Sequence, residues 1–147
     1  MAAFRGAHRT PAGTNLTILA LESSAAVVGK LYEMIIGSDA TPADVATRFD
    51  LIRHTTAGTG GTAVVEKPTD PQGSAAACNL RGGTMTEPTY EADFLLEIAL
   101  HQRATFMWKA EEGREFRAVV GTANGLGIRS ISSGGTPNVN CSIGWLE

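Results

Sequence analysis

The sequence predicts an all-β domain: a two-sheet antiparallel sandwich, jelly-roll-like, with one or two short helices in the crossovers. Three observations lead to this fold class. Apolar and polar residues alternate with a period of two over many short segments, which is typical of half-buried strands. Glycine, proline and asparagine separate these segments at steps of about ten residues, the spacing of a sandwich. The segment 139–145 also places Val139, Cys141, Ile143 and Trp145 on one face, so it is expected to be a core strand.

The 147 residues are expected to form two unequal parts. Residues 1–14 show almost no apolar periodicity and contain Arg5, His8 and Arg9. They are expected to form an extended N-terminal arm that becomes ordered against a neighbouring protein. Residues 15–147 are expected to form a single β-sandwich domain of ordinary size.

In the first half of the sandwich, the pattern predicts three strands and one short helix. Alternating apolar residues favour strands at 15–21 and 26–36, the second being rich in Val, Ile and Tyr. Thr41-Pro42-Ala43-Asp44 combines an N-cap, a proline in the first turn and an acidic residue, so it predicts a helix ending near Thr47. Residues 49–54 alternate again as a third strand, and 55–62 are expected to be a loop.

The middle of the chain is dominated by connections. Residues 63–66 favour a short strand, and two prolines make 67–73 an exposed connection. Three consecutive alanines predict one or two helical turns over 74–80. Glycines at 82 and 83 and Pro88 then punctuate the next connection.

The segment 90–110 is compatible with two structures. At 3.6 residues per turn its apolar residues share one helical face, and intrinsic propensity mildly favours that helix. At a period of two, 94–100 and 106–110 are two strands. The turn-like residues 111–114 and the alternating residues 116–120 favour the strands, because a chain with strands on both sides is usually a sandwich throughout.

The last twenty-six residues, 122–147, predict a β-hairpin. Asn124-Gly125 forms a turn, and an alternating strand follows from Leu126 to Ser130. The residues Gly134 to Pro137 form the hairpin turn that leads into the closing strand at 139–145.

Composition excludes several classes of function. The net charge is −3 and there is no basic run, so direct nucleic-acid binding is not expected. No apolar stretch is long enough to span a bilayer, and residues 1–10 lack the apolar core of a secretory signal. Cys78 and Cys141 form no CxxC pair and are expected to be small buried hydrophobes, as in a protein assembled in a reducing cytoplasm. Charged residues are only 18% of the chain, which suits a surface partly covered by partners.

No motif predicts catalysis, a metal or a cofactor. The glycine-rich residues 58–61 lack the Lys-Ser/Thr of a P-loop, and Gly125-Leu-Gly127 lacks a third glycine. His54 and His101 have no metal ligands at local spacing, and Asp50 with His54 is expected to be a surface polar pair. The larger aromatics are expected to lie in the core: Tyr32, Phe49, Phe94, Phe106, Trp108, Phe116 and Trp145. The protein is therefore not expected to be an enzyme.

Several stretches together resemble a family of small tailed-bacteriophage virion proteins, the capsid cement or decoration proteins. These stretches cover most of residues 15–147: Lys30–Glu33, Ile36–Asp44, Leu51–Arg53, Thr55–Thr62, Gln102–Phe106 with Trp108, and Asn124–Trp145. In similar sequences the region matching 95–110 is a strand, which agrees with the preferred interpretation above. The resemblance is weakest over the expected arm.

The resemblance implies a structural virion protein, assembled in the host cytoplasm, that binds the capsid exterior and bridges neighbouring major capsid protein subunits. It also implies self-association into a dimer or trimer, and no contact with a membrane. The resemblance assigns no contact residues; Arg5, His8 and Arg9 are candidates because they lie on the expected arm. Two alternatives remain: a tail, fibre or receptor-binding sandwich, and an enzyme or small-ligand binder with a site near His54 and His101.

Overall fold

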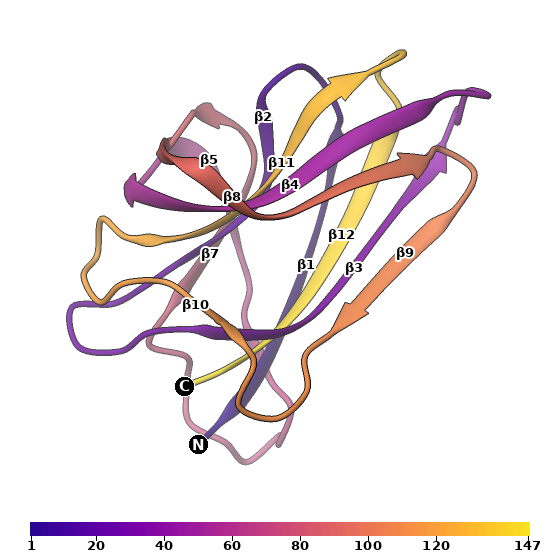
Figure 1. Ribbon diagram of the computed structural model, residues 1–147. Coiled ribbons are helices and arrows are strands. Elements are labelled where there is room, and N and C mark those ends of the chain that lie inside the picture. Colours follow the sequence, from indigo (N-terminus) through magenta and orange to yellow (C-terminus); the bar gives the residue numbers. More distant parts are fainter.

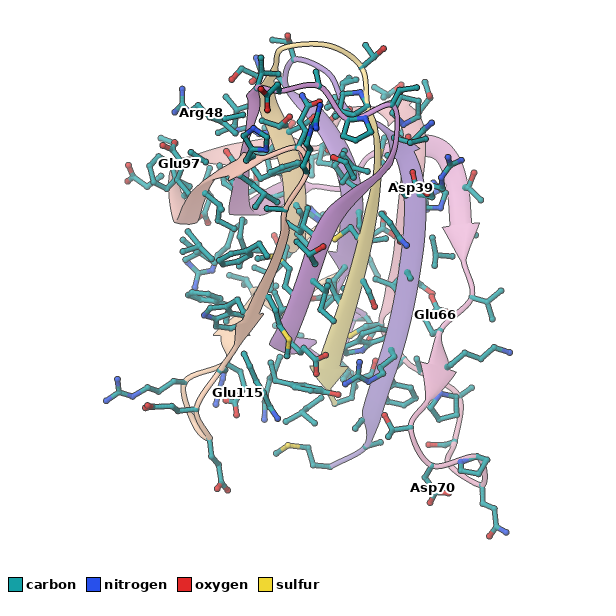
Figure 2. All side chains as sticks on the ribbon, turned by 90° about the vertical axis from the view of Figure 1, so that its right-hand side faces the viewer. Asp39, Arg48, Glu66, Asp70, Glu97 and Glu115 are labelled. Carbon is teal, nitrogen blue, oxygen red and sulfur yellow. The ribbon has the colours of Figure 1, made fainter. Side chains whose placement is uncertain are left out.

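The protein folds into two antiparallel β-sheets that pack face to face, as the computed structural model shows (Figure 1). The structure describes the backbone of residues 1–147 and the side chains of residues 1–132 and 134–147, and none of the described residues is helical. Charged side chains such as Asp39, Arg48 and Asp70 project outward from this sandwich (Figure 2). The predicted all-β sandwich is therefore confirmed, whereas the expected helices are absent.

Six strands form each sheet. Sheet A has the order β10-β3-β12-β1-β6, and β9 also pairs with β3. Its strands are β1 (Ala3–Pro11), β3 (Lys30–Ala40), β6 (Lys67–Pro68), β9 (Thr105–Lys109), β10 (Phe116–Arg117) and β12 (Asn138–Leu146). Sheet B has the order β5-β7-β2-β11-β4-β8. Its strands are β2 (Leu16–Glu22), β4 (Ala46–Thr56), β5 (Thr59–Val64), β7 (Asn79–Thr86), β8 (Thr89–His101) and β11 (Gly125–Ser133).

The chain passes back and forth between the sheets, so most strand pairs join residues far apart in sequence. Strands β1 to β4 alternate between sheet A and sheet B. After β5–β7, strand β8 lies in sheet B, β9 and β10 in sheet A, β11 in sheet B and β12 in sheet A. The two ends meet in sheet A, where Ala2 and Glu147 exchange backbone hydrogen bonds of 2.9 Å each way. Figure 1 shows the termini side by side at one end of the sandwich.

The core lies between the sheets and is made of large apolar side chains. Phe4 and Trp145 stack within it, with ring centroids 5.7 Å apart. Cys78 and Cys141 are buried and unpaired with each other, as the sequence predicts, and burial raises the pKa of the Cys78 thiol to about 12. The central members of the core are Phe4, Ile18, Leu19, Leu31, Met34, Ile36, Phe49, Leu51, Leu80, Leu126, Ile128 and Trp145.

Residues 1–14, expected to be an arm, are instead part of the sandwich. Ala3–Pro11 forms β1, which pairs with β12 along its whole length and also with β6. The pattern hides this strand because two of its core-facing residues, Gly6 and His8, are not apolar. Gly6 is required there, since a β-carbon would lie 2.1 Å from Cδ1 of Leu80. A small residue at this position lets the two sheets approach closely.

The predicted C-terminal hairpin is also wrong in its pairing. Its two strands exist as β11 and β12, but β11 pairs with β2 and β4, whereas β12 pairs with β1 and β3. The residues 134–137 therefore carry the chain from sheet B to sheet A. Turn residues predict that the chain changes direction. They do not predict whether the two flanking strands hydrogen-bond to each other.

Irregular connections take the place of both predicted helices, and in each of them distant side chains accept hydrogen bonds from the backbone. At the first, Thr41 has the left-handed φ of 49°, and the backbone N–H of Ala43 donates to Oε1 of Gln102 at 2.8 Å. At the second, the N–H groups of Ala77 and Cys78 donate to the carboxylate of Glu147 at 2.8 and 2.9 Å. Distant side chains thus satisfy the backbone groups that a helix would have paired.

The segment 90–110 forms two strands, β8 and β9, so the preferred interpretation is confirmed. Several other bounds differ: the strand expected at 26–36 lies at 30–40, and of the alternating residues 116–120 only Phe116 and Arg117 are strand. The loop expected at 55–62 is largely the end of β4 and the start of β5, and the glycines at 82 and 83, expected in a connection, lie inside β7. Phe94 is 52% exposed, so its assignment to the core is wrong.

Candidate functional site

The outer face of sheet A is a regular surface built from four adjacent strands, β1, β12, β3 and β9. Alternation along β12 directs Val139, Cys141 and Ile143 into the core, so its other residues face outward. The strand register then aligns three rows across β1, β12, β3 and β9. The rows are Arg5-Gly144-Glu33-Lys109, Ala7-Ser142-Ile35-Met107 and Arg9-Asn140-Gly37-Thr105, and we call this surface the sheet A face.

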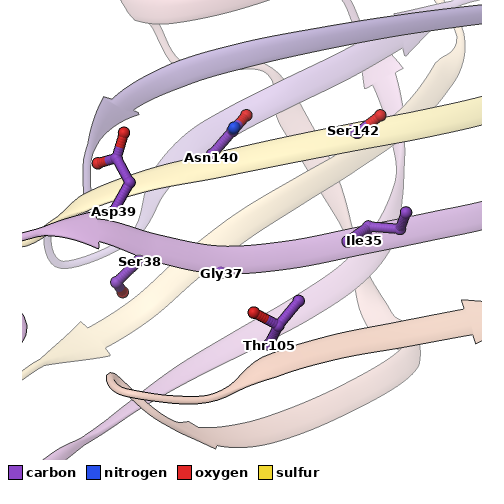
Figure 3. Close-up of a pocket in the computed structure, with 7 residues that line it drawn as sticks. All are labelled: Ile35, Gly37, Ser38, Asp39, Thr105, Asn140 and Ser142. Atoms are coloured by element: carbon purple, nitrogen blue, oxygen red, sulfur yellow. The ribbon is translucent and has the colours of Figure 1, made fainter.

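A hollow of about 220 Å³ lies on this face (Figure 3). It is lined by Ile35, Gly37, Ser38, Asp39, Thr105, Asn140 and Ser142. It forms because the middle of the face carries small side chains. Gly37 is the clearest case, since Oγ1 of Thr105 lies 3.0 Å from the position that a β-carbon would take. Polar and apolar atoms both line the hollow, and Asp39 is the one ionisable residue among the described residues of its lining.

Two of the three basic residues on the sheet A face, Arg5 and Arg9, are paired across the strands. Arg5 donates two hydrogen bonds to the carboxylate of Glu33, at 3.0 and 2.6 Å. This contact raises the pKa of Arg5, so its guanidinium stays charged. Arg9 likewise donates to the carboxylate of Asp39. A partner that covers Arg5 and Arg9 meets charges that already have partners, which lowers the cost of removing water from them.

The three residues that the sequence suggests as contacts do not lie on one surface. Arg5 and Arg9 lie on the sheet A face, whereas His8 points between the sheets. A β-carbon at Gly82 would lie 2.4 Å from the His8 ring, and burial lowers the pKa of this histidine. Sequence reasoning missed Asn140 and Ser142, although their alternation with Cys141 was available as a signal.

The opposite surface, the outer face of sheet B, carries a buried polar network. Arg129 donates to the carboxylate of Asp50 at 2.6 and 3.2 Å, and its guanidinium lies 4.9 Å from the centre of the Tyr90 ring. The Tyr90 hydroxyl contacts Thr17 Oγ1, and Glu87 accepts a 3.0 Å hydrogen bond from the Thr17 N–H. Burial raises the pKa of Tyr90, so it remains a phenol. The network fastens the β7–β8 connection onto the sheet.

Two glycines of β11 explain how aromatic rings fit onto this face. A β-carbon at Gly127 would lie 2.5 Å from the Tyr90 hydroxyl, and one at Gly125 would lie 2.2 Å from Nε2 of His54. The Gly-Leu-Gly sequence thus makes room for ring packing on a strand. It has no relation to nucleotide binding.

His54 is a buried structural residue, only 1% exposed. Its Nδ1 lies 3.0 Å from the carbonyl oxygen of Ala123, which can only accept, so the neutral ring carries its proton on Nδ1. Asp50 instead binds Arg129, so the expected Asp50–His54 pair does not form. Nε2 is buried with no hydrogen-bond partner in the part of the chain that the structure describes.

We expect stability to fall as the solution is acidified, because burial lowers the pKa of His54 in the folded state. The unfolded chain takes up a proton near its ordinary pKa of about 6.5, while the folded chain resists it. This contribution is therefore complete above that pH and is lost progressively below it. Urea unfolding of the wild type and of His54→Asn, which retains a donor, measures the effect. The variant should show a shallower decline, and an equal decline in both would contradict this role.

The two histidines of the small-ligand alternative do not meet. His54 pairs with Tyr90 near one end of β4, whereas His101 pairs with Ala46 at the other end. Eight residues of extended strand separate them, which is about 27 Å. His101 instead bonds to Asp44, with Nε2 and Oδ1 3.1 Å apart. These two residues therefore form no common site.

Neither a metal site nor a similarity to a known protein assigns a function to this chain. Among the described residues, no group of three or more His, Cys, Asp and Glu residues is placed to hold a metal ion. No described helix is long and apolar enough to cross a membrane. Comparison with protein-family models, with curated proteins and with solved structures found no match to this chain.

Proposed function

We propose that this chain is a structural virion protein of the capsid cement or decoration type. It would bind the exterior of a phage head and bridge neighbouring major capsid protein subunits, with no catalytic step and no cofactor. The central strand orders β1-β12-β3-β9 and β2-β11-β4-β8 support jelly-roll wiring. This wiring is common in viral capsid and lectin domains, so it suits a virion protein without identifying one.

The sheet A face is the observation that carries the proposal. Its middle row, Ala7, Ser142, Ile35 and Met107, holds no charge, and Met107 is 60% exposed. The charges of Arg5 and Arg9 above and below that row are paired with acidic residues. Interface cores are depleted in free charges and enriched in methionine and arginine. The face is therefore suited to being covered by another protein.

The mechanism is adhesion by a rigid plate. Packaged DNA pushes a thin shell outward, and the shell opens at the seams between its subunits. A sandwich bound across a seam adds interface area, on the order of 1,200–2,000 Å² for a specific contact, that must break before the seam opens. Many copies on one shell make the effect cumulative.

Ser142→Arg tests this docking face. The substitution places an unpaired cation in the middle of the uncharged row, so occupancy on expanded phage heads should fall at least tenfold, a loss of about 1.4 kcal/mol in binding. Thr86→Arg, on an exposed position of β7 in sheet B, is the matched control and should bind like the wild type.

Copies bound per head, counted after purification of the particles, give the readout. Binding of Ser142→Arg equal to that of the control would reject the sheet A face as the contact surface. Absence of the wild-type protein from heads would reject the function, and a few copies confined to the tail would favour a tail or receptor-binding component instead.

A further inference from the structure

Strand β8 is an unpaired edge of the sandwich. It is the longest strand, with 13 residues, and it pairs only with β4. Register shifts interrupt its first half, between Thr89 and Leu96. From Leu96 to His101 the pairing with β4 is regular. Bulges blunt edge strands against further pairing, so residues 96–101 are the half of this edge that remains open to another strand.

An apolar seam lies along the same side of the molecule. Leu96, Ile98 and Leu100 of β8 pack on the core together with Phe106 and Trp108 of β9, yet each of them remains partly exposed. Figure 1 shows β8 and β9 following one another at this side of the sandwich. The seam is therefore a place where further burial of apolar surface is available.

The outward residues of this half-strand place no like charges opposite each other when a second copy of the same strand pairs with it. Glu97, Ala99 and His101 follow one another on the outer side and are all exposed. If two copies pair antiparallel about Ala99, Glu97 lies opposite His101 of the second copy. Ile98 then lies opposite Leu100 of the second copy on the inner side. Apolar residues thus meet apolar residues in this register, and Ala99 faces only itself.

Glu97 and His101 each already have a partner within their own chain. Arg48 donates to Glu97 at 2.8 Å, and Figure 2 shows both side chains projecting together from one side of the sandwich. The Nδ1 atom of His101 accepts from the backbone N–H of Arg103 at 3.2 Å, and its Nε2 bonds to Asp44. Pairing about Ala99 would therefore place the Arg48–Glu97 pair beside the His101 ring of the second copy, with no two carboxylates directly opposite each other. Like charges directly opposite each other would instead disfavour a register.

We propose that two copies of this chain form a dimer by antiparallel pairing of residues 97–101, with a two-fold axis at Ala99. The B sheets of the two copies then join into one continuous sheet, and the contact is the same patch on both, as in the commonest class of oligomer. The sheet A face lies on a different surface and stays free. The dimer does not depend on the capsid proposal.

Cysteine cross-linking tests the register directly. In Ala99→Cys the two new residues face each other with Cα atoms about 4.5–5.5 Å apart, a distance that a disulfide spans. Ala92→Cys is the matched control, because Ala92 is an exposed alanine of the same strand. In the proposed dimer its two copies are roughly 40 Å apart. The native cysteines are buried and do not compete.

Mild oxidation should convert most of Ala99→Cys to a covalent dimer on a non-reducing gel and leave Ala92→Cys monomeric. Sedimentation of the full chain gives the second readout. The wild type and Ala92→Lys should sediment as dimers, whereas Ala99→Lys should shift to monomer because two like charges meet at the axis. A monomeric wild type, or equal cross-linking of the two cysteine variants, would overturn the proposal. Loss of head binding by an intact dimer would count only against the proposed function.

Discussion

Deletion of residues 1–11 is expected to unfold the protein. The segment contains β1, which lies between β12 and β6 in sheet A. Its removal takes away Phe4, 1% exposed and stacked on Trp145, whose loss alone costs about 3–5 kcal/mol. It also leaves β12 without its partner on one side along nine register positions, so that only β3 still pairs with it. Together these losses approach the whole stability of an ordinary domain, about 5–15 kcal/mol.

Circular dichroism and urea unfolding of the truncated protein measure this effect. Phe4→Ala in the full chain is the graded control, and it should remain folded with a lower midpoint. A synthetic peptide of residues 1–13, added to the truncated chain, should restore the cooperative transition by replacing the strand. A truncated chain that unfolds as cooperatively as the wild type would show that residues 1–11 are dispensable, as an arm would be.

Local pattern predicted the strands whose inward residues are apolar, and it failed where they are not. β12 was placed within a residue or two because Val139, Cys141, Ile143 and Trp145 alternate without interruption. β1 was missed because Gly6 and His8 take inward positions that only contact with β7 explains. The strand-to-strand pairing of β11 and β12 was wrong for a related reason, since β11 bonds to β2 and β4, and β12 bonds to β1 and β3, all of them far earlier in the chain.

The candidate site was predictable only in part. Arg5 and Arg9 were identified, but their acidic partners Glu33 and Asp39 lie 28 and 30 residues further along the chain. Local sequence spacing does not predict these ion pairs, because only the strand register brings the two residues of each pair together. The same holds for Glu147, whose carboxylate holds the backbone near Cys78 and thereby replaces a predicted helical turn. Local sequence patterns therefore do not predict hydrogen bonds between a side chain and a backbone group far away in the sequence.

Arg129→Met is expected to cost about 3–5 kcal/mol of unfolding free energy, because it leaves the Asp50 carboxylate buried without its cation. The side chain of Asp50 is only 1% exposed, and Arg129 holds both of its oxygens. Methionine retains much of the apolar stem of arginine, so the loss reports on the charge more than on packing. The variant also loses the contact of the guanidinium with the Tyr90 ring.

Two further variants distinguish the stability contribution of the buried ion pair from that of an exposed ion pair. Arg9→Met breaks the exposed pair with Asp39, in which the side chains are 52% and 38% exposed, and should cost less than about 1 kcal/mol. The double variant Asp50→Leu with Arg129→Met removes both charges and should recover most of the loss, since an apolar pair of similar volume is often neutral. Chemical denaturation of the wild type, the two single variants and the double variant gives the comparison. If Arg129→Met costs no more than Arg9→Met, the network on sheet B is not what fastens the β7–β8 connection, and the rigidity of the plate must come from the core alone.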